Sequence, residues 1–356
     1  MRVLSALRHG HLPQMMGGTQ SVVHDLSTML QDDGHRVAVS ARITPSGFLY
    51  LKNRGKSKLP FIGPCPSDRI LGYPTYRGWN SIECIYSVCS TFRPDIVIMH
   101  GGWPLPEVAA VGDLGIPTIV YFHDISYVDS SKKFPHSRLV SCVANSNFTA
   151  GRVMEKLGAP CPVVLPITRL SKYALERMPQ YVTLINPIEK KGVDIAIAIA
   201  EARPDIQFLF VQAWQTLDEN ADGHIVQKTR KYKNIRFSRS VLDMKRIYRN
   251  TKILIMPSLL EESWGRSAVE AQASGIPVVA RDTGGLPEAV GCGGILLPSD
   301  ASPSAWVEAV SLLWDSKTDY DVFSRRASEN AAKIEKNISE SYHRLVGICL
   351  RHIADS

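Results

Sequence analysis

Short apolar runs alternate with segments of helical periodicity along the whole chain. The runs are rich in β-branched residues and are continuous rather than alternating, which is typical of parallel strands buried on both faces. The first series of expected strands is Arg2–Leu7, Arg36–Ala41, Asp95–His100, Pro117–Phe122, Leu139–Ala144 and Val163–Pro166. The second series is Tyr181–Ile185, Ile206–Val211, Asn234–Phe237, Lys252–Met256, Pro277–Ala280 and Gly294–Leu297.

The segments between these strands are long enough to hold helices. Between the first two strands, apolar residues recur at helical spacing, and they are Val22, Val23, Leu26, Met29 and Leu30. Two such βα series predict an α/β protein with two doubly wound, Rossmann-like domains. The length of 356 residues also favours two domains over one compact core.

The domain boundary is expected in the proline-rich stretch 158–180. We therefore expect an N-terminal domain over 1–165, a C-terminal domain over 166–335 and a helical tail over 336–356, whose return to the first domain is left open. Doubly wound sheets bind ligands at the carboxyl ends of their strands, so two facing domains imply an interdomain cleft. Residues Ile43–Asn80 have little periodicity and are expected to form a long functional loop.

Composition and charge narrow the class of protein. With 44% apolar and 21% charged residues the chain is an ordinary globular protein, which excludes long disorder and coiled coil. The net charge of +7 fits an anionic ligand, an anionic membrane surface, nucleic acid or a protein that is simply basic. No nucleic-acid-binding motif is present, so nucleic acid is not an expected partner. No signal-peptide pattern or membrane-length apolar run occurs, so we expect a cytoplasmic chain with peripheral membrane contact left open.

The cysteine pattern predicts free thiols. Seven cysteines, an odd number without the CxxC spacing, argue against a disulfide framework and against a zinc site. These residues are Cys65, Cys84, Cys89, Cys142, Cys161, Cys292 and Cys349.

The segment Met256–Gly291 carries the most chemical information. A strand runs into a loop with paired glutamates, then into a helix, a second strand and a glycine pair followed by Pro-Glu. Glu262 and Glu270 are eight residues apart, about 12 Å along a continuous helix, which is too far to share a proton or metal. Gly265 is expected to mark the turn into the helix, which leaves Glu262 in the loop. The helix start at Arg266 and Ser267 would then offer an anion site between two carboxylates, a layout that suits a nucleotide with hydroxyl-rich groups at both ends.

This segment resembles the retaining family 4 glycosyltransferases of GT-B fold. Their signature is a Glu, seven residues and a second Glu, with fixed flanking elements. In this chain the elements are Pro257-Ser258, Glu262 and Glu270, Gly275-Ile276-Pro277-Val278 and Gly284-Gly285-Leu286-Pro287-Glu288. The resemblance continues in the first half of the chain at Gly17-Gly18, Gly34-His35-Arg36-Val37, His123-Asp124 and Asn145-Ser146.

The resemblance implies a set of site residues. Catalytic roles fall on Glu262, which would bind donor-sugar hydroxyls, on His123, which would contact the sugar, and on Lys191, which would carry phosphate charge. Donor-binding roles fall on Gly17, Gly18, Asn186, Arg266, Ser267 and Glu270, with Glu270 on the ribose. No metal ligand and no cofactor is expected. Acceptor contacts are expected in the N-terminal domain, in the stretch Ile43–Asn80 or near Trp103.

One element departs from the family pattern. The family carries Gly-Arg followed by Lys-Gly after the first strand of the C-terminal domain, and this chain reads LINPIEKKGVD there. Lys191-Gly192 matches, but Asn186-Pro187 replaces the glycine and arginine. Neutral asparagine cannot balance diphosphate charge as a guanidinium does. We expect Arg266 to supply the missing charge, with Lys190 as the weaker candidate.

The resulting expectation is a retaining, metal-independent hexosyltransferase of polysaccharide or glycoconjugate biosynthesis. It would move a sugar from a nucleotide diphosphate sugar to a hydroxyl of a saccharide, lipid-linked or small-molecule acceptor. Two alternatives remain: a GT-B sugar-nucleotide epimerase, which needs no acceptor, and a nucleotide-binding regulatory or partner protein, which the missing arginine would explain.

Overall fold

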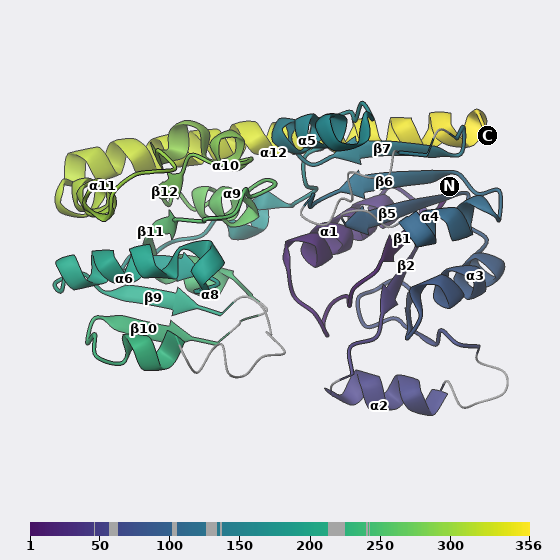
Figure 1. Cartoon of the computed structure of the whole chain (residues 1–356), viewed down its shortest axis with the longest axis horizontal. Coiled ribbons are helices and arrows are strands. Elements are labelled where there is room, and N and C mark those ends of the chain that lie inside the picture. Colours follow the sequence, from purple (N-terminus) through teal and green to yellow (C-terminus); the bar gives the residue numbers. More distant parts are fainter. Residues whose placement is uncertain are drawn as a thin grey trace. The chain divides into compact units, whose positions relative to one another are not determined.

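The computed structural model describes residues 1–45, 47–56, 63–101, 105–125, 134–135, 137–212, 225–239, 241 and 243–356. These residues divide into two compact units, drawn in Figure 1. Unit 1 comprises Met1–Thr168 and Ile338–Ser356, and unit 2 comprises Arg169–Asn337. The first division lies within the proline-rich stretch 158–180, and the second lies inside helix α12 (Lys317–Ala354).

Unit 1 contains a seven-stranded sheet in the order β3-β4-β2-β1-β5-β6-β7. All neighbouring strands are parallel except β3 and β4. The strands are β1 (Arg2–Leu7), β2 (Arg36–Arg42), β3 (Ser67–Asp68), β4 (Thr75–Gly78), β5 (Ile96–Gly101), β6 (Thr118–Phe122) and β7 (Val140–Ala144). The helices are α1 (Gly18–Asp32), α2 (Gly47–Lys56), α3 (Ser81–Phe92), α4 (Leu105–Gly112) and α5 (Asn147–Leu157).

Successive residues of β1 point to opposite faces of this sheet, and each face has its own core. Leu4 and Ala6 belong to the core that α3, α4 and α5 cover, whereas Leu7 packs with Val23 of α1 on the other face. The connections that leave β1 and β5 therefore run to opposite faces. The crevice between these two strand ends is the place where doubly wound sheets bind ligands.

Unit 2 contains a six-stranded parallel sheet in the order β10-β9-β8-β11-β12-β13. Its strands are β8 (Tyr181–Ile185), β9 (Phe208–Val211), β10 (Ile235–Ser238), β11 (Thr251–Met256), β12 (Val278–Arg281) and β13 (Gly294–Leu297). Its helices are α6 (Val193–Ala202), α8 (Lys245–Asn250), α9 (Arg266–Gln272), α10 (Leu286–Val290), α11 (Pro303–Asp315) and the first part of α12. Short 3-10 turns lie at η1 (Leu170–Tyr173), η2 (Glu189–Lys191) and η3 (Gly291–Gly293).

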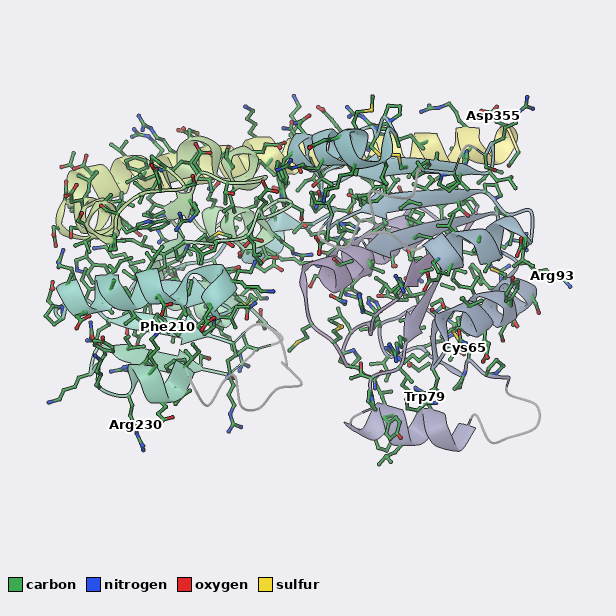
Figure 2. All side chains as sticks on the ribbon, viewed as in Figure 1. Cys65, Trp79, Arg93, Phe210, Arg230 and Asp355 are labelled. Atoms are coloured by element: carbon green, nitrogen blue, oxygen red, sulfur yellow. A yellow bond between two sulfur atoms is a disulfide. The ribbon has the colours of Figure 1, made fainter. Side chains whose placement is uncertain are left out.

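The strand order of unit 2 is the Rossmann order, and unit 1 repeats it with β3 added at one edge. Helices α6 and α11 cover one face of the second sheet, and α8, α9 and α10 cover the other. Phe210 of β9 is fully buried in this core, whereas Arg230 extends from the surface of the same unit (Figure 2). The α/β class and both parallel sheets agree with the expectation from the sequence.

Two expectations about local structure are wrong. The expected strand Val163–Pro166 is no strand, because Val163 forms only an isolated bridge with Ala144. The stretch Ile43–Asn80 is not simply a loop, because its described residues form α2, β3 and β4. Strand β4 has no apolar run in its sequence, since one of its buried residues is Arg77. The Nε of Arg77 donates to Asp68 Oδ2 over 2.8 Å.

The expectation of free thiols throughout is also wrong. The structure contains two disulfides, Cys65–Cys84 and Cys142–Cys161, both within unit 1. Cys89 and Cys349 are buried free thiols, and Cys292 is exposed. Disulfides persist mainly in oxidising compartments, so the cysteines no longer support a cytoplasmic location. No helix in the described ranges is long and apolar enough to cross a membrane.

We predict that the Cys65–Cys84 disulfide stabilises unit 1. Its cysteines are 19 residues apart, and closing a loop of that size stabilises a fold by roughly 3 kcal/mol. Replacing both by Ser should lower the thermal midpoint by several degrees in calorimetry, whereas Cys292→Ser should leave it unchanged. Peptide mapping without reductant should find both linked peptide pairs, and seven free thiols in the native protein would contradict the disulfides.

Candidate functional site in the second unit

The loops that follow β8 and β11 meet at the carboxyl edge of the second sheet. Gly192 has a φ of 75°, and a Cβ there would collide with the carbonyl oxygen of Pro257. The backbone N–H of Leu259 donates to the carbonyl of Lys190 over 3.0 Å. Only glycine permits both the left-handed conformation and this close approach. The contact fixes Lys191 beside the loop that carries Glu262.

Lys191 and Glu262 form an ion pair between Nζ and Oε1. Their side chains are 26% and 17% exposed, so the pair is partly desolvated yet open to a ligand. The sequence predicted both residues for the site, and the structure brings them together. A carboxylate beside an ammonium at this strand edge can bind hydroxyl groups and anionic groups at the same time.

Glu262 is held in its loop by the glycine pair that follows β12. Gly284 has a φ of 60°, and a Cβ there would collide with the backbone of Glu262. A Cβ on Gly285 would meet the carbonyl oxygen of Ser263 at 2.5 Å. The N–H of Gly285 donates to the carbonyl of Glu262 over 2.6 Å. The glycine pair therefore supports the glutamate loop from below, which gives this part of the motif a structural reason.

Glu270 lies in a second charged cluster. Helix α9 begins at Arg266 after Gly265, whose φ is 135°, so Glu270 is inside the helix and Glu262 is in the loop, as expected. Arg266 Nε donates to Glu270 Oε1 over 2.5 Å, and the Tyr248 hydroxyl donates to Oε2 over 2.8 Å. The side chain of Glu270 is 7% exposed. A carboxylate oxygen can accept two hydrogen bonds, so both oxygens of Glu270 have capacity for a ligand.

Tyr248 is a site residue that the sequence analysis missed. It lies on α8, is fully buried, and its ring packs edge-on against Tyr173 with centroids 5.8 Å apart. Burial, followed by the neighbouring Glu270 carboxylate, raises the pKa of the Tyr248 phenol far above its usual value. The hydroxyl therefore stays protonated and serves as a donor to Glu270. Nothing in the local sequence around Tyr248 indicates this partner, which depends on the packing of α8 against α9.

Asn186 explains half of the departure from the family pattern. Its φ is 61°, one of two positive values among the described non-glycine residues. Asparagine adopts this left-handed region more readily than other side chains with a Cβ. Asn186 thus provides the backbone conformation that a glycine would provide. The arginine position is occupied by Pro187, which is buried and has no charge to offer.

Ser267 and Lys190 are the remaining candidates of the second unit. The Ser267 hydroxyl lies in the first turn of α9 and contacts the Met256 sulfur at 3.9 Å. Helix α9 has only seven residues, so its dipole is small. We therefore attribute any attraction of an anion at this position to charged side chains and not to the helix N-terminus. Lys190 is exposed.

Predicted site residues in the first unit

His123 lies just beyond the end of β6 and is held by a chain of buried polar groups. Its Nε2 lies 3.0 Å from His100 Nδ1, and His100 Nε2 lies 3.3 Å from the Ser5 hydroxyl. Burial, and then the neighbouring His123, lowers the pKa of His100 far below its usual value, so His100 is neutral at pH 7. Asn145 Nδ2 donates to the carbonyl of His123 over 3.3 Å. His100 is the second residue that the sequence analysis missed.

Gly17 and Gly18 begin helix α1. Gly17 is its extended N-cap residue, and a Cβ on Gly18 would have no atom within 4 Å. The preceding loop is anchored by Arg77, which donates to the carbonyls of His11 and Leu12 over 3.3 and 2.6 Å. The described residues of unit 1 therefore leave space for a side chain at position 18. Trp103 lies outside the described residues.

The described residues contain no group of three or more His, Cys, Asp or Glu side chains that could hold a metal ion. The chain does contain an Asp-x-Asp sequence at Asp319 and Asp321, in the first turns of α12, where Asp321 pairs with Lys317 over 2.5 Å.

Family models match both halves of the chain. The model described as Glycosyltransferase Family 4 matches residues 16–166, and the model described as Glycosyl transferases group 1 matches residues 181–316. A Corynebacterium glutamicum protein named D-inositol 3-phosphate glycosyltransferase is 42% identical over 95 residues. That match covers 26% of this chain and 22% of the relative.

Solved structures resemble the whole chain. Sucrose-phosphate synthase from Thermosynechococcus elongatus matches with a TM-score of 0.74 at 14% identity and covers 100% of both chains. Anabaena HepE, solved in complex with UDP-glucose, matches with a TM-score of 0.73 at 15% identity and covers 97% of this chain and 99% of that one. These similarities confirm the expected GT-B fold class.

We predict that Gly284→Ala displaces the Glu262 loop. Its cost has two parts, the left-handed backbone of about 1 kcal/mol and the collision with Glu262. Gly115→Ala is the matched control, because Gly115 has a similar φ of 66° but open space around it. Chemical denaturation should find Gly284→Ala clearly less stable than Gly115→Ala. Equal losses would mean that the close approach carries no energy.

Proposed function

We propose that this chain, both halves of which match glycosyltransferase family models, is a retaining, metal-independent hexosyltransferase of the family 4 type. It moves a sugar from a nucleoside diphosphate sugar to an acceptor hydroxyl. The observation that carries the proposal is the Lys191–Glu262 ion pair at the carboxyl edge of the second sheet. The UDP-glucose in the HepE structure supports a uridine donor and a glucose-like sugar.

The leaving group of this reaction is a nucleoside diphosphate, so the catalytic demand is stabilisation of developing negative charge. Lys191 and Arg266 provide that positive charge without a metal. Gly18 lets the backbone approach the diphosphate, and Asn186 and Ser267 line the donor site. Lys191 is paired with Glu262, and Arg266 is paired with Glu270. When the donor binds, each cation contacts both its carboxylate and the diphosphate.

The two glutamates divide the sugars of the donor between them. Glu262, the more exposed, binds hydroxyls of the transferred sugar and favours the cationic centre that forms there. Glu270, held by Arg266 and Tyr248, accepts from the ribose hydroxyls. His123 contacts the sugar, and its hydrogen-bonded neighbour His100 sets its orientation.

The acceptor is a hydroxyl-bearing saccharide, lipid-linked or small molecule of polysaccharide or glycoconjugate biosynthesis. Peripheral contact with a membrane surface is supported by α2, on which Phe48 and Leu51 are 76% and 64% exposed. The sequence of this helix also contains Lys52, Arg54 and Lys56. A cytoplasmic location stays a prediction, against which the disulfides stand.

The decisive test is turnover of a donor panel by wild-type protein and by Glu262→Gln. We expect release of free nucleotide from one of the UDP-, GDP- or ADP-sugars, and a loss of roughly a hundredfold or more in kcat for Glu262→Gln. Glu261→Gln, which changes the exposed neighbouring carboxylate, should keep near-normal turnover. Proton NMR of the product should find the anomeric configuration of the donor.

Other outcomes of this assay would overturn the proposal. Interconversion of donor sugars without an acceptor would indicate an epimerase. Tight nucleotide binding without turnover of any donor would indicate a regulatory protein, the reading that uncharged Pro187 favours. Inverted product would leave the transferase but reject retention.

We predict that Arg266→Gln raises the donor KM about tenfold or more and flattens its dependence on salt, because a charge-assisted contact with phosphate is lost. Arg325→Gln is the control, since Arg325 forms an exposed pair of the same helical spacing with Glu329. An unchanged donor KM and salt dependence would remove Arg266 from the phosphate site.

A further inference from the structure

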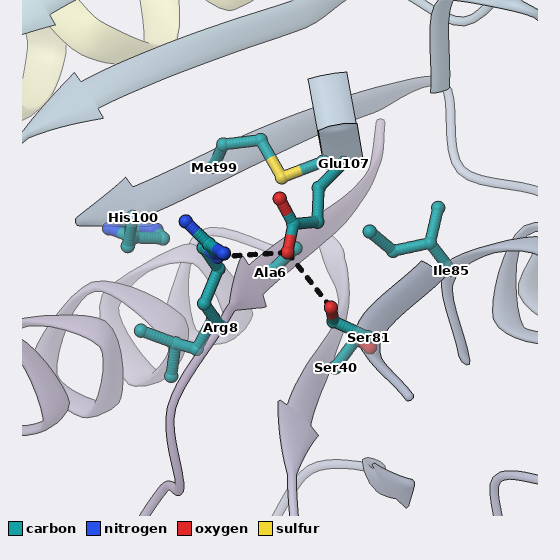
Figure 3. Close-up of a pocket in the computed structure, with 9 residues that line it drawn as sticks. Ala6, Arg8, Ser40, Ser81, Ile85, Met99, His100 and Glu107 are labelled. Atoms are coloured by element: carbon teal, nitrogen blue, oxygen red, sulfur yellow. Dashed lines mark hydrogen bonds and ion pairs between the residues drawn. The ribbon is translucent and has the colours of Figure 1, made fainter. Parts of the chain in front are cut away.

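A small pocket lies at the carboxyl edge of the sheet in unit 1, in the crevice between the ends of β1 and β5 (Figure 3). Its polar walls are Arg8 after β1, Ser40 of β2, Ser81 of α3, His100 of β5 and Glu107 of α4. The connections after β1 and β5 run to opposite faces of the sheet here, which is the usual ligand position of a doubly wound domain. None of the roles assigned above uses Glu107, Arg8 or Ser81.

Glu107 is buried with half of its carboxylate unsatisfied. Its side chain is 4% exposed, and Oε1 accepts from Ser81 Oγ over 2.8 Å and from Arg8 Nε over 3.0 Å. Oε2 is buried and has no hydrogen-bond partner in the described part of the chain. In Figure 3 both dashed lines end on one oxygen, and the other oxygen lies on the side of Met99. A buried carboxylate oxygen without a donor is costly, and proteins seldom keep one without a function.

The described neighbours of Glu107 do not donate a hydrogen bond to Oε2. Both nitrogens of His100 already face His123 and Ser5, and its lowered pKa keeps it neutral. Arg8 compensates the charge of Glu107 and is half exposed, which leaves the pair within reach of solvent. Among the described residues, Oε2 therefore lacks a hydrogen-bond donor, although Arg8 supplies a positive charge to the same carboxylate.

Charge around the pocket selects the kind of donor. Burial, then the charges of Arg8 and Arg42, lowers the pKa of His9, which follows β1, whereas the Glu107 carboxylate raises it. Arg8 already balances the charge of Glu107, so an incoming ammonium group would add an unbalanced charge at this pair. A neutral hydroxyl donates to Oε2 without adding a charge.

We propose that Glu107, oriented by Arg8 and Ser81, binds a hydroxyl group of a polyhydroxylated ligand, a polyol or saccharide. The ligand hydroxyl donates to Oε2, and the pocket has space for a single hydroxyl group while the rest of the ligand stays outside it. Identification of this ligand as the acceptor rests on the proposed transferase function, whereas the binding itself does not.

The test uses the full chain and ligand-observed NMR with millimolar myo-inositol, D-glucose and D-inositol 3-phosphate. At least one should bind the wild type, and Glu107→Gln should weaken that binding about tenfold, because the amide oxygen of glutamine is an uncharged and weaker acceptor. Glu83→Gln is the control, an exposed carboxylate in the first turn of α3. Should Glu107→Gln fail to fold, Ser81→Ala, which only loosens the carboxylate, should weaken binding about threefold.

Absence of binding by all three probes would overturn the proposal, and so would equal binding by wild type and Glu107→Gln. A crystal structure with ligand elsewhere and a lone water on Oε2 would also overturn it. The donor assay separates the two proposals. Glu107-dependent binding without turnover of any nucleotide sugar would reject the transferase function and keep the hydroxyl site. Turnover with an acceptor KM that Glu107→Gln leaves unchanged would keep the transferase function and reject the site as part of the acceptor binding.

Discussion

Backbone-to-backbone contact at the carboxyl edge of the second sheet is the constraint on which the candidate site depends. Gly192 packs on the carbonyl of Pro257, and Gly284 packs on the backbone of Glu262. A side chain at either glycine would separate loops that follow three different strands. These contacts place Lys191 and Glu262 within ion-pair distance, although 71 residues separate them in the chain. The position of the charges thus follows from positions that carry no side chain, because rigid backbone is what holds a site in register.

Each carboxylate of the candidate site in unit 2 is paired with a cation, Glu262 with Lys191 and Glu270 with Arg266. Four ionised side chains in two pairs sum to zero, so the site gains no net positive charge from Lys191 and Arg266 alone. On the proposed function, an incoming diphosphate must therefore draw the cations partly away from Glu262 and Glu270. Carboxylates released in this way are strong acceptors for sugar hydroxyls. Phosphate and sugar binding are then coupled through the same two pairs, and a donor that lacks either part binds poorly.

Sequence periodicity predicted the sheets well because strands buried on both faces must be apolar throughout. It failed where burial is achieved in another way. Arg77 is buried in β4 through Asp68 and two carbonyls, so that strand has no apolar run. The apolar run Val163–Pro166 follows Pro162, ends in a second proline and forms a single bridge. The motif indicated Lys191, Glu262, Arg266 and Glu270, but Tyr248, His100 and both disulfides depend on residues that only the fold brings together.

The two units share one Rossmann strand order. They differ in the residues at the crevice where the connections from two neighbouring strands run to opposite faces of the sheet. In unit 2 the crevice carries ion pairs with partly exposed cations, which suits a phosphate ligand. In unit 1 the chain from Ser5 through His100 to His123 is buried, and His100 in it is neutral. Glu107 beside it is already compensated by Arg8. An uncharged hydroxyl can donate to the remaining oxygen of Glu107 without desolvating an ion. On the two proposals, unit 2 binds phosphate and unit 1 binds a hydroxyl group, and this difference arises from the residues at equivalent strand ends and not from the strand order.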